Sequence, residues 1–237
     1  MTVAERYERN LGTIGPEGQA KLTKARVAVI GAGGLGGHVV ELLARMGVGY
    51  LRVIDGDTFA AHNLNRQLLA TENNLGQNKA VVAAARVAMV NSAVTVDAVS
   101  DMLTADNALQ LLNGMDVIVD CLDNFGARMT AGKAARELFV PMVHAAIAGF
   151  TGQVTTIYPG DRSLELIYKS SGESDRGIET VLGNPAATPA LAASLQVQET
   201  VKIITGLGVP LRNRLLYFDT EYNLFDVFDL APKEEQP

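Results

Sequence analysis

Three glycines follow a short apolar run and have the spacing of a nucleotide-binding turn. Residues 27–30, VAVI, lead into Gly31, Gly33 and Gly36, which satisfy the pattern GxGxxG ahead of an amphipathic segment. Glycines at a strand-to-helix turn let the backbone approach a phosphate group, so that amides at the helix N-terminus can bind its oxygens. The motif alone is weak, because a glycine turn can also serve only the packing of a helix on a strand.

An acidic residue ends the next apolar run, LRVIDGD. Asp55 lies near the distance of about 20 residues from the glycines at which a carboxylate accepts hydrogen bonds from ribose hydroxyl groups. This spacing favours a bound nucleotide over a purely structural turn. It leaves NAD, FAD and ATP open.

Two cations follow in loops at the same edge of the predicted sheet. Arg66 lies in HNLNRQ, and Lys79 lies in GQNKA at the start of a helix. Hydride transfer has little use for two cations beside a pyrophosphate, whereas phosphoryl chemistry needs positive charge to neutralise phosphate oxygens. The pair therefore favours ATP. The alternative is that both belong to a solvated face, where most lysines and arginines lie.

A further acidic segment, DCLDN, ends the apolar run DVIVD. A carboxylate at the carboxyl end of a strand can hold a hydrated Mg²⁺ ion, which prefers oxygen ligands and substrate phosphates. Asp123 is the candidate metal ligand. Alternatively, Asp123 and Asn124 cap the helix that follows.

Alternating strands and helices must position these residues. Strands are predicted at residues 26–30, 50–54, 94–99 and 116–121, and helices at 35–45, 78–90, 106–112 and 127–139. Continuous apolar strands are typical of a parallel sheet covered on both faces, with the ligand at the carboxyl ends of the strands.

The pattern changes after Pro141, where two strands follow without a helix between them, and a helix is predicted at residues 190–205. The predicted fold class is α/β: a Rossmann-like, mostly parallel sheet flanked by helices and continued by a mixed or antiparallel C-terminal half. A single domain, 1–237, would contain a helical arm (1–25), a nucleotide-binding half (26–140) and a mixed-sheet half (141–237). The loop 161–189, rich in Ser, Gly, Asp and Pro, is the candidate mobile segment.

Charge and composition narrow the class of protein. The formal net charge is −6, so there is no general attraction for nucleic acid or anionic lipid. The first residues alternate charges where a signal peptide would be apolar, and no run is apolar enough to span a bilayer, which predicts a cytoplasmic protein. One cysteine, Cys121, excludes an internal disulfide and a zinc site built from cysteine pairs.

Taken together and in this order, the motifs resemble the ThiF/MoeB/HesA family, bacterial relatives of ubiquitin-activating enzymes. The segments that carry the resemblance are RYERN, VAVIGAGGLGG, LRVIDGD, HNLNRQ, GQNKA, DCLDN, GFTGQVTTIYPG and PALAASLQVQETVKIITG, which cover nearly the whole chain. The resemblance implies an ATP-dependent adenylyltransferase that uses Mg·ATP. Its substrate would be the C-terminal glycine carboxylate of a small ubiquitin-like sulfur-carrier protein ending in Gly-Gly, and a homodimer would carry out the reaction.

The resemblance also implies roles for individual residues. Gly34 would lie against the nucleotide, Asp55 would bind the ribose, and Asp123 with Asn124 would serve the metal and the nucleotide. Arg9 matches an arginine that reaches into the neighbouring subunit's site. The residues implied in phosphate contacts are His62, Asn63, Leu64, Asn65, Arg66 and Lys79.

The chain departs from the family at its cysteines. The two CxxC pairs that hold zinc in many members are missing, and the loop 161–189 has no cysteine for a covalent intermediate. Cys121 is therefore interpreted as a packing residue, and another protein or an external nucleophile would have to resolve the adenylate. An ionised carboxylate can attack the α-phosphorus without a general base, so the three histidines of the chain need no catalytic role.

Two other functions remain open from the sequence. One is activation of a carboxylate on tRNA, as in threonylcarbamoyl-adenosine, although the negative net charge is against binding of tRNA. The other is a non-catalytic nucleotide-binding scaffold. Aromatic residues in the last two predicted strands could belong to the core or to a surface that docks the carrier. They are Tyr217, Phe218, Tyr222, Phe225 and Phe228.

Overall fold

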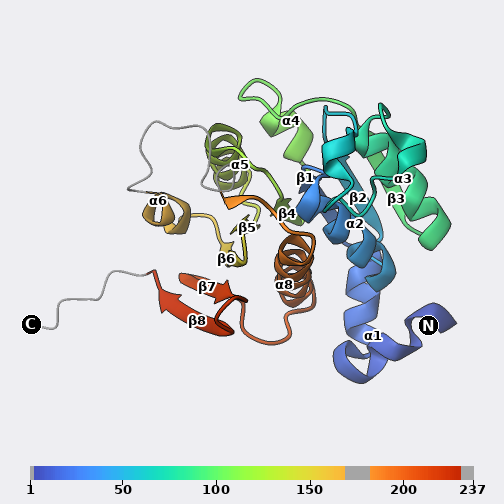
Figure 1. Cartoon of the computed structure of the whole chain (residues 1–237). Coiled ribbons are helices and arrows are strands. Elements are labelled where there is room, and N and C mark those ends of the chain that lie inside the picture. Colours follow the sequence, from blue (N-terminus) through green and yellow to red (C-terminus); the bar gives the residue numbers. More distant parts are fainter. Residues whose placement is uncertain (1–2, 169–181, 231–237) are drawn as a thin grey trace, which may run out of the picture.

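A computed structural model describes residues 3–168 and 182–230 of the chain, and it contains one eight-stranded sheet (Figure 1). The strand order is β3-β2-β1-β4-β5-β6-β7-β8. The strands are β1 (Arg26–Ile30), β2 (Tyr50–Ile54), β3 (Thr95–Val99), β4 (Val117–Asp120), β5 (Met142–Ala148), β6 (Thr151–Ile157), β7 (Arg214–Asp219) and β8 (Leu224–Asp229). The first two strands have the bounds predicted from the sequence.

Helices precede the first strand, connect the strands of the parallel half and continue between β6 and β7. They are α1 (Glu8–Lys24), α2 (Gly34–Met46), α3 (Lys79–Val90), α4 (Ala108–Leu112), α5 (Phe125–Glu137), α6 (Ser163–Ile167) and α8 (Ala187–Thr205). Three short 3₁₀ helices are η1 (Glu5–Tyr7), η2 (Ala61–Asn63) and η3 (Glu72–Asn74). Helix α1 is broken at Gly15, whose φ of 66° lies in the left-handed region, and Pro16 follows the break.

The sheet is parallel from β3 to β5 and antiparallel from β5 to β8, so the predicted fold class is confirmed. The change occurs because β5 and β6 are joined by a tight turn at Gly149, whose φ is 56°. A parallel pair would need a crossover of a dozen residues or more. The turn therefore forces β6 to run back along β5.

Alternation along the central strands sends side chains to two apolar layers. Val27 and Val29 of β1 pack in the larger cluster with helices α1, α2, α3 and α8, whereas Ala28 and Ile30 pack in the smaller cluster with α4 and α5. Figure 1 shows α4 and α5 together at the top of the view and α1 at the lower right. Both faces of the parallel half are covered, as continuous apolar strands require.

Helices α2, α5 and α8 begin earlier than predicted, α2 by a single residue. Helix α5 begins at Phe125 because Asn124 caps it, and α8 begins at Ala187 because Pro189 is tolerated in a first helical turn. The segment 161–189 therefore holds α6 and the start of α8, and residues 169–181 lie outside the described part. Over 3–168 and 182–230, no helix combines the length and apolar character needed to cross a membrane.

The aromatic residues of β7, β8 and the turn between them divide between core and surface. Phe218 is fully buried, whereas Tyr222, Phe225 and Phe228 are more than half exposed. Every residue of β8 is exposed, and β8 is the last strand of the sheet. The interpretation of the cluster as core is therefore wrong for β8.

Candidate nucleotide and carboxylate site

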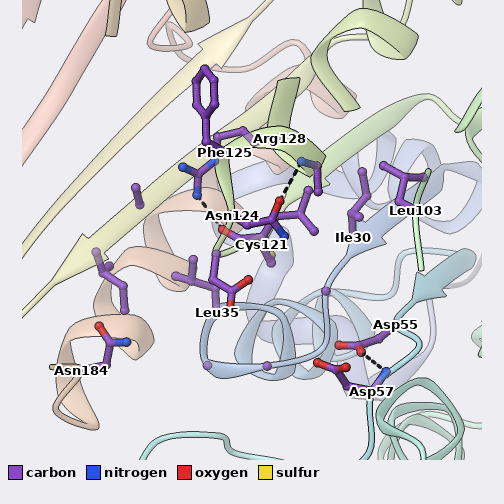
Figure 2. Close-up of a pocket in the computed structure, with 18 of the residues that line it drawn as sticks. Ile30, Leu35, Asp55, Asp57, Leu103, Cys121, Asn124, Phe125, Arg128 and Asn184 are labelled. Atoms are coloured by element: carbon purple, nitrogen blue, oxygen red, sulfur yellow. Dashed lines mark hydrogen bonds between the residues drawn. The ribbon is translucent and has the colours of Figure 1, made fainter. Parts of the chain in front are cut away.

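A cavity of about 510 Å³ opens at the carboxyl ends of the parallel strands and is lined by both halves of the chain. Figure 2 shows Asp55 and Asp57 at one end and Asn184 at the other, with Leu35 and Cys121 between them. The polar residues that line it are Asp55, Asp57, Arg66, Gln67, Lys79, Asp101, Asp123, Asn124, Arg128, Thr151, Gln153, Tyr168, Asn184 and Tyr217.

The glycine turn forms the floor of this cavity at the start of α2. Gly31, Gly33 and Gly34 line the cavity, and α2 begins at Gly34, so its first amides lie beside the open space. Gly31 has a φ of +90°, and a Cβ there would lie 2.8 Å from the Cys121 carbonyl oxygen. Gly36 is not among the lining residues, and its Cβ would lie 1.8 Å from the Gly31 carbonyl oxygen. Gly36 thus serves the close packing of helix on turn.

Asp55 follows β2 and is bound by backbone amides. Its Oδ2 accepts from the Ala32 amide at 2.7 Å, and its Oδ1 accepts from the Asp57 amide at 2.9 Å. Burial raises the pKa of Asp55, and the two backbone hydrogen bonds offset only part of that effect. No side-chain cation contacts this carboxylate within hydrogen-bond distance among the described residues.

The two predicted cations both line the cavity. Lys79 is buried, and its Nζ lies 3.2 Å from Oδ2 of the more exposed Asp57. Arg66 donates through Nη1 to the His62 carbonyl and to Asn65 Oδ1, at 3.0 and 2.8 Å. Positive charge therefore lies beside the glycine turn, as phosphate oxygens require.

Residues 62–65, which precede Arg66, do not line the cavity. His62, Leu64 and Asn65 are exposed, and Asn65 Nδ2 donates to the Asn184 carbonyl at 3.1 Å. Asn63 is buried, and its Oδ1 accepts from the Ala60 amide at 3.0 Å. These contacts make the segment a support for Arg66.

Two amides at the cavity wall have acceptors without partners. Gln67 Oε1 and Asn184 Oδ1 are buried, with no hydrogen-bond partner in the described part of the chain. Gln67 lies next to Gly33, since a Cβ on that glycine would be 3.4 Å from Gln67 Nε2. Both oxygens are available to an N–H or O–H group of a ligand.

The loop after β4 carries Asp123 and Asn124 to the cavity. Asp123 is exposed and lines it, while Asn124 Oδ1 accepts from the Ala127 amide at 2.8 Å and so caps α5. The capping alternative is thereby confirmed for Asn124. Within 3–168 and 182–230, no three His, Cys, Asp or Glu side chains cluster as metal ligands. A Mg²⁺ ion here would rely on Asp123, substrate phosphates and water.

A buried polar network behind this loop was not predicted from the sequence. Asp120 Oδ2 lies 3.2 Å from Arg128 Nε and 2.7 Å from His144 Nδ1. Tyr168 Oη is 2.6 Å from Arg128 Nη1 and 3.2 Å from His144 Nε2. The available signal was the pairing of β4 with β5, which sets Asp120 beside His144. Arg128 and Tyr168 carried no such signal.

Charge in this network is fixed by its surroundings. Burial alone would raise the pKa of Asp120, but the charge of Arg128 and the hydrogen bond from His144 outweigh it and lower that pKa. Burial lowers the pKa of His144, so the imidazole is neutral at physiological pH. Asp120 and Arg128 therefore form a buried ion pair within this network.

Cys121 lines the cavity as a packing residue, whereas Arg9 does not line the cavity of its own chain. Cys121 is buried, burial raises the pKa of its thiol well above the usual value, and its Sγ lies 3.7 Å from Gln196 Oε1. This environment supports the packing interpretation. Arg9 lies exposed on α1 and does not line the cavity of its own chain.

The fold and the pocket define an α/β protein with a ligand-sized cavity at the carboxyl ends of its parallel strands. The chain belongs to the ThiF family, whose model matches residues 7–237. It is 36% identical over 242 residues to the SAMP-activating enzyme E1 of Haloferax volcanii, covering 100% of this chain and 87% of that protein. It is 36% identical over 229 residues to the sulfur carrier protein adenylyltransferase of Thermus thermophilus, covering 91% and 83%.

The fold is also similar to a solved structure of MccB from E. coli. The TM-score is 0.84 at 22% sequence identity, over 98% of this chain and 71% of MccB. The family and its relatives place the chain among the ATP-dependent adenylyltransferases.

Proposed function

We propose that this enzyme binds Mg·ATP in the cavity and adenylates the C-terminal glycine carboxylate of a small ubiquitin-like sulfur-carrier protein. The proposal rests on one observation: Arg66, Lys79, Asp55 and the glycine turn all line the same cavity. The names of the relatives, a SAMP-activating enzyme and a sulfur carrier protein adenylyltransferase, support this substrate class.

The nucleotide would lie across the glycine turn. Amides at the start of α2 would bind phosphate oxygens, and Gly34, which has no side chain, leaves them open. Asp55 would accept hydrogen bonds from the ribose hydroxyl groups, because its two oxygens each have a second lone pair beyond the amide they already bind. Arg66 and Lys79 would neutralise the phosphate chain.

Magnesium fits the donor set of the β4–α5 loop. Asp123 offers an exposed carboxylate at the cavity wall, and Mg²⁺ commonly takes one or two carboxylates together with phosphate oxygens and water. When bound, the ion supplies positive charge to the departing pyrophosphate. Asn124 would help the nucleotide only through its backbone or its free amide hydrogens, since Oδ1 caps α5.

The reaction needs positioning more than acid or base chemistry. A glycine carboxylate is ionised at neutral pH, so one of its oxygens can attack the α-phosphorus while the bond to the bridging oxygen of pyrophosphate breaks. The products are an acyl-adenylate and pyrophosphate. His144 is neutral and buried and Cys121 is a buried thiol, which agrees with a step that needs neither.

The carrier would approach over the antiparallel half. Ala146, Ala148 and Gly152 line the cavity with small side chains and leave space for a narrow peptide terminus. The exposed apolar residues of β8 would contact the body of the carrier. They are Leu224, Phe225, Val227 and Phe228. Because both halves line one cavity, we treat the chain as a single adenylation domain.

We further propose a homodimer in which Arg9 completes the partner subunit's site. Arg9 is exposed and away from the cavity of its own chain, which leaves it free to reach another copy. Mixing Arg9→Ala with Asp123→Ala protein tests this. Mixed dimers contain one intact site, so they should regain activity that neither variant shows alone; absence of any recovery would contradict the shared site.

The test of the reaction is ATP–pyrophosphate exchange with purified protein, Mg²⁺ and candidate carriers. Exchange should require an intact Gly-Gly terminus on the carrier. Arg66→Ala and Lys79→Ala should each lower exchange by about a hundredfold or more, because a cation at a developing phosphate charge is lost. Lys24→Ala, an exposed lysine on α1 outside the cavity, is the control and should change nothing.

Three outcomes would contradict the proposal. Unchanged exchange in Arg66→Ala and Lys79→Ala would remove their phosphate roles. Exchange with carriers that lack Gly-Gly would remove the carboxylate substrate. ATP binding without exchange for any carrier would favour a tRNA-borne carboxylate or a non-catalytic scaffold.

A further inference from the structure

The loop that carries Asp123 is held by side chains at both backbone polar groups of a single residue, Leu122. The Leu122 amide donates to Asp120 Oδ1 at 3.0 Å, and the Leu122 carbonyl accepts from Arg128 Nη2 at 2.6 Å. Asp120 and Arg128 also bind each other through Oδ2 and Nε, at 3.2 Å. Leu122 directly precedes Asp123, so the ion pair fixes the backbone from which that carboxylate extends.

Two further side chains belong to this network. Ionised Asp120 only accepts, so His144 Nδ1 carries the hydrogen and donates to it. The neutral ring then accepts at Nε2, so the Tyr168 hydroxyl donates there while its oxygen accepts from Arg128 Nη1. Each hydrogen that points between these four side chains therefore meets an acceptor.

The network joins elements that are far apart in the sequence. Asp120 ends β4, Arg128 lies in α5, His144 lies in β5 and Tyr168 directly follows α6. The Tyr168 ring also packs edge-on against Phe125, with ring centroids 5.5 Å apart. Figure 2 shows Arg128 and Phe125 close to Asn124 at the cavity wall.

We propose that Arg128 and Tyr168 are positioning residues that hold the backbone at Leu122, and through it Asp123, in the geometry that receives Mg·ATP. The proposal rests on the proposed function for the ligand. That the two side chains hold the backbone at Leu122 concerns the free protein and does not depend on the proposed function. Neither residue need touch the reacting atoms.

A buried ion pair can also serve stability alone. The two roles differ in what a mild substitution changes. If the network only stabilises, losing hydrogen bonds from it lowers global stability and leaves the backbone at Leu122 as it was. If it positions the loop, the same loss frees the Leu122 amide locally and weakens the metal-dependent part of ATP binding.

The test uses Tyr168→Phe and Arg128→Lys in the full-length protein. Tyr168→Phe removes one hydroxyl, and Arg128→Lys keeps the charge but loses the planar fork that contacts Asp120, Leu122 and Tyr168. The matched control is Arg136→Gln. Arg136 also lies in α5 and joins it to Glu165 of α6, but it does not contact Leu122 or the cavity.

Two readouts are measured. Hydrogen exchange of the Leu122 amide in the free protein should be about fivefold faster in Tyr168→Phe, and faster still in Arg128→Lys, after correction for global stability. The Mg²⁺ concentration for half-maximal ATP binding is followed by calorimetry. It should rise about fivefold in Tyr168→Phe and further in Arg128→Lys. The affinity for ATP without Mg²⁺ should change less than twofold in Tyr168→Phe and Arg128→Lys. In Arg136→Gln, both readouts should change less than twofold.

Unchanged Leu122 exchange in both variants would overturn the proposal, whatever happens to the melting temperature. Faster exchange with an unchanged Mg²⁺ requirement would overturn the link to the metal. A wild-type protein that binds no ATP would refute the proposed function instead, and Leu122 exchange in that protein would still decide whether the two side chains hold the loop.

Discussion

Two carboxylates on either side of β1 are buried by different means. Asp55 follows β2 and is bound by the Ala32 and Asp57 amides, whereas Asp120 ends β4 and is bound by Arg128 and His144. Burial is the largest influence on both. It raises the pKa of Asp55, but the Arg128 charge and the His144 hydrogen bond lower that of Asp120.

The difference separates a ligand-binding role from a supporting role. Backbone amides supply partial charge without saturating a carboxylate, so Asp55 keeps acceptor capacity on the cavity side. A full cation and an imidazole both bind Oδ2 of Asp120, which is fully buried and does not line the cavity. Two aspartates at equivalent strand ends thus differ because of the atoms that reach them from other elements.

The largest effect is expected from removing the cation beside Asp120. Arg128→Met should lower the free energy of unfolding by about 3–5 kcal/mol, because it leaves a buried carboxylate without its charged partner. Urea denaturation measures this. Arg136→Gln, which breaks a more exposed ion pair on the same helix, should cost less than about 1 kcal/mol. Equal losses in the two variants would break the comparison.

A smaller effect, on binding, is expected at Asp55. Asp55→Asn should weaken ATP binding by about 10–100-fold, because an amide oxygen is a weaker acceptor than a carboxylate for ribose hydroxyl groups. Isothermal calorimetry measures the affinity. ATP binding at wild-type strength in Asp55→Asn would show that Asp55 serves only the turn.

The smallest effect is an opposite pH dependence of stability. The folded pKa of Asp55 is raised, so its favourable contribution is present below the unfolded value of about 3.9 and is lost as pH rises through the folded pKa. The folded pKa of Asp120 is lowered, so its contribution is present above about 3.9 and is lost as pH falls through the folded pKa.

Urea unfolding between pH 7 and pH 3 can test this with the two Asn variants. Relative to Asp55→Asn, the wild-type protein should gain stability as pH falls toward about 4; relative to Asp120→Asn, it should lose stability only below about 4. If the stability difference changed with pH in the same direction and over the same pH range for both variants, the two environments would be equivalent.

Local patterns predicted much of the nucleotide half. Strands β1 and β2 have their predicted bounds, because continuous apolar runs end at glycine and aspartate. The glycine turn, Asp55, Arg66, Lys79 and Asp123 line one cavity because parallel strands bring their carboxyl ends to one edge. Segment 62–65 was expected at the phosphates, yet none of it lines the cavity, since loop packing rather than spacing directs those side chains.

The sequence by itself determined the fold class, the edge of the sheet that carries the chemistry and the family. Each of these depends on residues close together in the chain or on motif order. Tertiary structure alone decided the network of Asp120, Arg128, His144 and Tyr168, and the exposure of β8. These depend on contacts between distant segments, where a hydrogen bond forms only when two elements pack at one distance and orientation, and no periodicity in either element encodes that geometry.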